Sequence, residues 1–160
     1  LKKFRQEENY EVTNEILPQS LVYTIHILIF IALGDEEQTL QAQKLTESIK
    51  TNPAYVRQLM ATLKNAGIVV NTQGHANAAL AKPADKINMY DIYRAVEGDK
   101  PLLHLDTDTN PDCGIGINIQ FAIGDFYHEI QNMVDEKMKS ITLQDIIDRY
   151  YFKIRKVKNL

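Results

Sequence analysis

Apolar residues recur at helical spacing across residues 51–67 (TNPAYVRQLMATLKNAG), and the patterns on either side are best understood around this segment. Asn52 is a good helix N-cap, and the proline after it suits the first helical position because its missing N–H would be unpaired there in any case. A glycine at position 67 ends the helix. Four apolar side chains share one face, namely Val56, Leu59, Met60 and Leu63. The pattern therefore predicts a helix that buries one face and leaves Arg57 and Gln58 on its polar side.

Shorter patterns flank this helix on both sides. Residues 39–49 predict a second helix, and the connection at residues 50–51 is as short as a helix-turn-helix requires. Downstream, apolar runs at 68–71 and 78–81 are separated by a polar turn that contains glycine, which predicts a β-hairpin. Upstream, residues 18–33 predict a buried helix that is apolar nearly all round. This order of elements is typical of a winged helix-turn-helix domain, which we assign to residues 16–83.

Residues 84–160 follow a different pattern. A linker helix is predicted at 89–97, a long loop at 99–114, a helix at 115–139 and a last short helix from about residue 142, ending in a basic tail. Along the longest helix, apolar residues recur in steps of four and three, as in a coiled-coil seam: Ile119, Ile123, Phe126, Ile130 and Met133. We expect this seam to pair with the same helix of a second copy; the alternative is that it packs on its own chain. The fold class is therefore mainly α with a small β-hairpin wing, and 84–160 forms a dimerisation region.

Charge distribution bears on the choice of partner. The chain has 160 residues with 44% hydrophobic content, enough for one core together with a dimer interface, and its net charge is −3. Residues 39–66 carry +3, residues 84–148 carry −8 and residues 149–160 carry +5. A locally basic helix-turn-helix favours double-stranded DNA as the partner. The acidic remainder favours, more weakly, the alternative of a winged-helix module that binds a partner protein.

The lone cysteine and the longest apolar run indicate the compartment. Cys113 cannot form an intrachain disulfide and fits a reducing cytosol. The apolar run at 21–33 is shorter than the roughly 20 residues needed to cross a bilayer, and the polar N-terminus does not resemble a signal peptide. We therefore expect a cytoplasmic protein without membrane contact.

Catalytic and metal-binding motifs give no strong signal. A phosphate-cradling glycine loop, HExxH and GxSxG are all absent from the sequence, so an enzyme is not expected. Acidic residues alternate across 106–112 as in a calcium loop, but Pro111 and Ile117 stand where that loop needs glycine and glutamate. His104, the nearby aspartates and Cys113 match no standard metal site, so no metal or cofactor is expected. Cys113 lies near the expected start of the long helix, where the helix dipole favours a thiolate, and it is our candidate redox or effector site.

Several phrases resemble the Rrf2 family of bacterial winged-helix transcription regulators. The matching stretches are YTIHILIFIAL, LTESIKTNPAYVRQLMATLKNAGIV, LAKPADKINMYDIYRAVEGDKPLLHL and NPDCGIGINIQ, which together span about residues 17–147. Within the family, the chain is most similar to the branch labelled YwnA-like, which carries NPDC where other members carry cluster ligands. The resemblance implies a homodimer crossed by the long helix, a palindromic operator bound by two helix-turn-helices, and usually repression.

Two features depart from the family pattern. Iron–sulfur members use three closely spaced cysteines before the long helix, whereas this loop has only Cys113, so a conventional cluster lacks ligands. The family's wing tip is rich in glycine and arginine, whereas QGHANAA has no arginine, which puts wing contacts to DNA in doubt.

The recognition helix supplies the expected DNA contacts. Arginine and glutamine can each bind one base edge through two hydrogen bonds, and a helix N-terminus attracts phosphate. We expect six residues to lie near DNA: Lys50, Thr51, Asn52, Tyr55, Arg57 and Gln58. The first three should lie near phosphates, Arg57 and Gln58 near base edges, and Tyr55 near a phosphate or a thymine methyl. Whether a small molecule or an oxidant serves as effector is left open.

Overall fold

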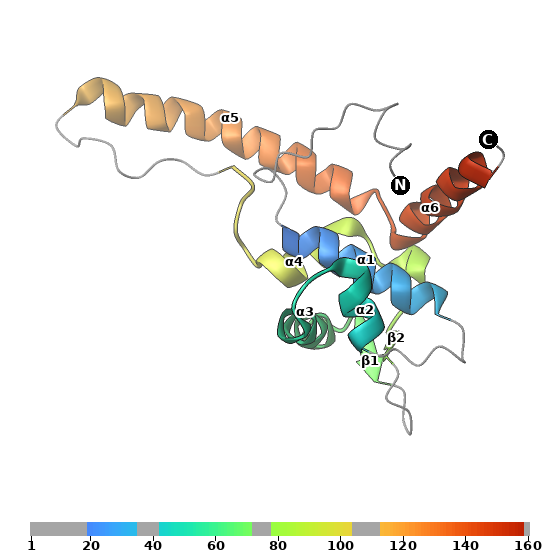
Figure 1. Ribbon diagram of the computed structural model, residues 1–160. Coiled ribbons are helices and arrows are strands. Elements are labelled where there is room, and N and C mark those ends of the chain that lie inside the picture. The colour runs from blue at the N-terminus through green and yellow to red at the C-terminus, as the bar shows by residue number, and fades with distance from the viewer. Residues whose placement is uncertain (1–18, 35–41, 72–77, 104–112, 159–160) are drawn as a thin grey trace.

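The helices and strands follow the predicted order along the chain and form a mainly helical structure with one small antiparallel hairpin (Figure 1). The computed structural model describes residues 19–34, 42–71, 78–103 and 113–158. The elements are α1 (Gln19–Leu33), α2 (Ala42–Ile49), α3 (Pro53–Asn65), β1 (Val69–Asn71), β2 (Ala78–Leu80), the 3₁₀ turn η2 (Ala84–Lys86), α4 (Met89–Glu97), α5 (Gly114–Lys139) and α6 (Leu143–Lys158).

Among the described residues, one buried cluster joins elements from both halves of the chain. Its most deeply buried large side chains come from α1, α2, α3, α4, α6 and the segment before α4, and include Leu21, Ile27, Leu28, Leu45, Leu63, Ile87, Ile92 and Leu143. Burial of one such aliphatic side chain stabilises the fold by about 1.5–3 kcal/mol. The cluster therefore holds α4 against both α1 and α3, while α5 extends away from it as a long rod (Figure 1). The domain boundary at residue 83 stays a prediction, and core residues lie on both sides of it.

Local hydrogen bonds begin and end the helices as the sequence predicts. Asn52 Oδ1 accepts from the backbone N–H of Ala54 at 2.7 Å, and Asn88 Oδ1 accepts from Asp91 at 2.8 Å. The glycines at 67 and 98 both have φ of 67°, a positive value that glycine adopts without strain. These caps confirm the predicted ends of α3 and α4.

The last helix is longer than predicted. Thr142 and Asp145 form the expected cap, because the Thr142 hydroxyl donates to Asp145 Oδ2 at 2.7 Å and the Asp145 N–H donates back to that hydroxyl at 3.1 Å. However, α6 has 16 residues, so the prediction of a short helix is wrong. The basic tail continues the helix because Ile147 and Ile154 extend the same inward stripe as the buried Leu143.

Backbone hydrogen bonds tie the segment before α4 to the turn between α5 and α6. The Leu143 N–H donates to the Ile87 carbonyl at 2.8 Å, and the Met89 N–H donates to the Ile141 carbonyl at 2.8 Å. Farther along, the Leu102 N–H donates to Gln131 Oε1 at 2.8 Å, which fastens the chain after α4 to the long helix. The position of α5 relative to the helix-turn-helix therefore depends on α4 and its flanks.

One side-chain contact joins α1 directly to α2. The ring Nε2 of His26 lies 3.0 Å from the hydroxyl of Ser48, near the end of α2. Burial lowers the pKa of His26 below its ordinary value of 6.5, so the ring is neutral at pH 7. A neutral ring can share a hydrogen bond with Ser48 without leaving a buried charge.

Within the described residues, no helix combines the length and the apolar character needed to cross a membrane.

Candidate DNA-binding interface

Helices α2 and α3 form the predicted helix-turn-helix. Ile49 ends α2, and α3 begins four residues later behind the N-cap Asn52. The facing sides of the two helices are buried and contribute Leu45, Ile49, Val56, Leu59 and Leu63 to the core. This packing leaves the opposite side of α3 exposed.

Arg57 and Gln58 lie on that exposed side. Neither side chain forms a hydrogen bond or ion pair with another described residue. The stripe of Val56, Leu59 and Leu63 fixes the rotation of α3, so the guanidinium and the amide can reach outward. Both groups are therefore exposed to solvent, and their contact with a base edge stays a prediction.

Tyr55 has a different environment from its neighbours. Its side chain is half-buried, and its ring packs edge-on against Tyr23 of α1 with the ring centroids 6.2 Å apart. This contact anchors the first turn of α3 to α1. A DNA contact by Tyr55 stays a prediction.

The residues before α3 are arranged around its N-terminus. Lys50 is exposed and has φ of 54°, the only positive φ of a non-glycine residue in the described parts of the chain. The half-buried Thr51 donates its N–H to the Thr46 carbonyl at 3.3 Å, which closes the end of α2. The side-chain oxygen of Asn52 is used by the cap, so only its NH₂ group remains free for a phosphate.

The left-handed conformation of Lys50 leads to a stability prediction. A side chain other than glycine is strained there, so Lys50→Gly should stabilise the protein by about 1 kcal/mol. Urea unfolding at one fixed protein concentration measures this change. The matched control is Lys50→Ala, which removes the charge but keeps the strain and should be close to neutral. Equal stability of the two variants would contradict the prediction.

The hairpin that forms the wing has the predicted strands. In β1 and β2, Val69 pairs with Leu80 and Asn71 pairs with Ala78 in antiparallel register. The wing tip, residues 72–77, lies outside the described residues, so its contribution to DNA binding stays a prediction.

Cys113 lies at the start of α5, where it was predicted. Its thiol is exposed, and Sγ accepts from the Gly116 N–H at 3.4 Å as the N-cap of the helix. Within the described residues, no three His, Cys, Asp or Glu side chains are grouped to hold a metal ion. The loop with His104 and its neighbouring aspartates lies outside them.

The seam predicted on α5 is largely uncovered in a single chain. Phe126 and Met133 are 65% and 71% exposed, Ile119 and Ile130 are also exposed, and Ile123 is half-buried. Ile115 and Phe121 add two exposed apolar side chains that the heptad spacing did not include. In the sequence, only the apolar character of these two residues marks them, because they do not occupy positions of the heptad seam. So much exposed apolar surface on one helix is typical of an interface.

Comparison with known proteins places this geometry in a family. The family model Rrf2, described as an iron-dependent transcriptional regulator, matches residues 17–149. The HTH-type transcriptional regulator YwnA of Bacillus subtilis (strain 168) is 30% identical over 131 residues, covering 82% of this chain and 96% of YwnA. The HTH-type transcriptional regulator NsrR of Oceanobacillus iheyensis is 26% identical over 132 residues, covering 78% of this chain and 84% of NsrR. The solved structure of CymR, the global cysteine regulator of B. subtilis, has a TM-score of 0.62 at 24% identity, covering 82% of this chain and 95% of CymR, and shows the same fold.

Proposed function

Since this chain belongs to the Rrf2 family of transcriptional regulators, we propose that it binds a palindromic DNA operator as a homodimer and represses transcription there. The observation that carries the proposal is the exposed side of α3, where Arg57 and Gln58 form no hydrogen bond or ion pair with other described residues. Arginine can bind guanine O6 and N7, and glutamine can bind adenine N6 and N7, when a helix enters the major groove. A DNA-binding regulator of this kind acts in the bacterial cytoplasm.

Charge supports the orientation of α3 toward DNA. Residues 39–66 carry +3, although the whole chain carries −3. The N-terminus of α3, with Lys50, Thr51 and Asn52 beside it, offers the positive end of a helix dipole together with one lysine. Phosphate contacts here would set the depth of α3 in the groove, and Arg57 and Gln58 would then read sequence.

The exposed seam on α5 supports the proposed homodimer. Phe126 and Met133 expose apolar surface to water in a single chain. This surface leaves water only if another surface covers it, and such burial is favourable. A second copy offers the same seam, and a two-fold axis between two α5 helices would make the interface self-complementary. Two copies of α3 related by that axis would require an operator of matching symmetry.

Iron and an effector are separate questions. Although the matching family is described as iron-dependent, this chain has one cysteine, and a cluster held by cysteine thiolates needs more ligands than Cys113 supplies. The residues present therefore do not fit such a cluster. We propose Cys113 instead as the position where an oxidant would act, because its thiol is exposed at the start of α5.

Selection of bound sequences from random DNA tests the proposed function. We expect enrichment of a palindrome, and titration of that sequence should show an affinity that falls steeply with salt as counterions are released. Random DNA of the same length is the control and should bind more weakly by about 10³-fold or more. Absence of enrichment, together with salt-independent binding, would overturn DNA recognition and favour a module that binds a partner protein.

A further inference from the structure

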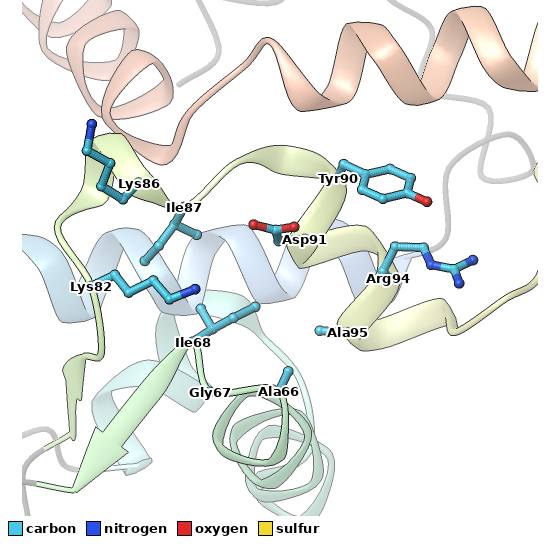
Figure 2. Close-up of a pocket in the computed structure, with 10 residues that line it drawn as sticks. All are labelled: Ala66, Gly67, Ile68, Lys82, Lys86, Ile87, Tyr90, Asp91, Arg94 and Ala95. Carbon is cyan, nitrogen blue, oxygen red and sulfur yellow. The ribbon is translucent and has the colours of Figure 1, made fainter.

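A cavity lies behind the recognition helix, between the C-terminal end of α3, the chain that leaves β2, and α4 (Figure 2). We call it the α4 pocket; the lining residues that matter here are Ile68, Lys82, Lys86, Ile87, Tyr90 and Arg94. Its volume of about 570 Å³ falls within the usual range of small-molecule sites, roughly 300–1,000 Å³. None of these residues belongs to the DNA-contacting set proposed above.

The lining of the α4 pocket is cationic in a region that is otherwise acidic. Three cations, Lys82, Lys86 and Arg94, line it together with one carboxylate, Asp91. The surrounding segment, residues 84–148, carries −8. Figure 2 shows the Lys82 side chain directed along Ile68 toward the middle of the cavity. The Asp91 carboxylate also lies near the middle, and the Lys86 and Arg94 side chains extend away from it at opposite ends.

These cations are only weakly engaged within the chain. Lys82 forms no ion pair with any described residue. Lys86 pairs with its neighbour Asp85 at 3.4 Å, and both side chains are exposed. Arg94 pairs with the highly exposed Asp99. Exposed ion pairs contribute about 0–1 kcal/mol, so an anionic ligand could replace either carboxylate at little cost.

The cavity also has an apolar wall. It is formed by the buried side chains of Ile68 and Ile87 and the half-buried ring of Tyr90. Lys139, which pairs with Glu136 at 2.7 Å, lies 4.9 Å from the centre of the Tyr90 ring, and Arg94 lies 5.9 Å from it, so two cations face the ring. The site therefore combines one cation and one carboxylate near its centre with a cation at each end and an apolar surface between them.

We propose that the α4 pocket binds a small organic dianion, with its two acidic groups on the cations and its carbon skeleton against Ile87 and Tyr90. A dicarboxylate has this chemistry: two acceptors for ammonium and guanidinium donors, separated by a short apolar chain. A monovalent or cationic ligand would leave part of the positive lining unmatched.

The position of the α4 pocket links its occupancy to DNA binding, and this step rests on the proposed function. One wall, Gly67 and Ile68, directly follows α3. The opposite wall is hydrogen-bonded to the α5–α6 turn through the Ile87 carbonyl and Leu143. A ligand that draws these walls together changes the angle between α3 and α5, and with it the spacing of the two recognition helices in a dimer. The ligand therefore acts as an effector because it binds one arrangement of α3 and α5 more tightly than the other.

Binding is tested first without DNA. Full-length protein is titrated with succinate while backbone NMR signals of Ile68 and Ile87 are followed. We expect saturable shifts at these positions, and at least a tenfold weaker affinity in Lys82→Gln. The matched control is Lys137→Gln, which removes one exposed lysine on α5 and should bind succinate as the unmodified protein does. Shifts that do not saturate, or that are equally affected by both substitutions, would overturn the proposed site.

Operator titrations then distinguish a small ligand from a DNA phosphate in the same pocket. Saturating succinate should change operator affinity about tenfold in the unmodified protein and leave Lys82→Gln unaffected. Without succinate, Lys82→Gln should bind the operator with unchanged affinity and salt dependence. A loss of affinity for all DNA sequences in that variant would instead assign Lys82 to a phosphate contact and overturn the ligand site. If succinate binds but no operator is found, the site stands and only the proposed function fails.

Discussion

Aspartate at Phe126 and Met133 is expected to convert the dimer into monomers. Both side chains are highly exposed in the single chain and contribute nothing to its buried cluster, so the change should leave each protomer folded. In a dimer they would lie in the seam between two α5 helices, where unpaired carboxylates lose several kcal/mol of hydration each. Sedimentation equilibrium measures the result, and urea unfolding shows whether the monomer stays folded.

A matched control separates the seam from the rest of α5. His128 and Asn132 are exposed on the side of the helix away from the seam, and His128→Asp with Asn132→Asp changes charge there without entering it. We expect this variant to remain dimeric. A dimer that survives aspartate at Phe126 and Met133, or an unmodified protein that sediments as a monomer, would contradict the α5 interface. The monomeric variant should also lose most of its operator affinity, since it can occupy only one half-site at a time.

Arg57→Ala is expected to weaken operator binding by about 1–3 kcal/mol and to relax the preference at one base pair in each half-site. The guanidinium is exposed on the second turn of α3 and forms no ion pair with another described residue, so its removal should not disturb the fold. Titrations with the operator and with single-base variants measure both effects. Equal loss on operator and random DNA would show that Arg57 contacts the backbone.

Two lysines serve as comparisons for Arg57. Lys50→Ala, beside the helix N-terminus, should weaken all sequences alike and reduce the slope of affinity against salt by about one charge. Lys64→Ala, exposed in the last turn of the same helix, should change binding much less because it lies away from the N-terminal turns that enter the groove. Unchanged affinity in both Arg57→Ala and Lys50→Ala would favour the partner-protein alternative.

The predicted elements depended on interactions between near neighbours. Asn52 caps the N–H two residues later, Asn88 caps the N–H three residues later, and the stripe of Val56, Leu59 and Leu63 repeats within one helix. Such interactions are complete within one or two turns, so residue types and spacing are sufficient to predict them. The pattern did not predict the full length of α6, because the apolar stripe that continues through Ile154 is weak among the charged residues of the tail.

Features that join distant segments could not be predicted in this way. The ring of Tyr55 packs on that of Tyr23, which is remote in sequence. Lys50 carries no sequence signal for its left-handed conformation after α2, because glycine or asparagine usually occupies such a position. Lys82 and Arg94 belong to separate elements with unrelated patterns, and they line one cavity only after α4 packs beside α3.

The sequence by itself determined the helices, their caps, the hairpin, the apolar seam on α5 and the family. Each of these depends on side chains close together along the chain or on phrases that can be compared directly. Only the tertiary structure decided which side chains of α3 remain free, how far the seam is exposed, and that three cations surround one cavity behind the recognition helix. The physical reason is that burial and cavity shape arise from packing between segments far apart in sequence, whose relative position no local pattern encodes.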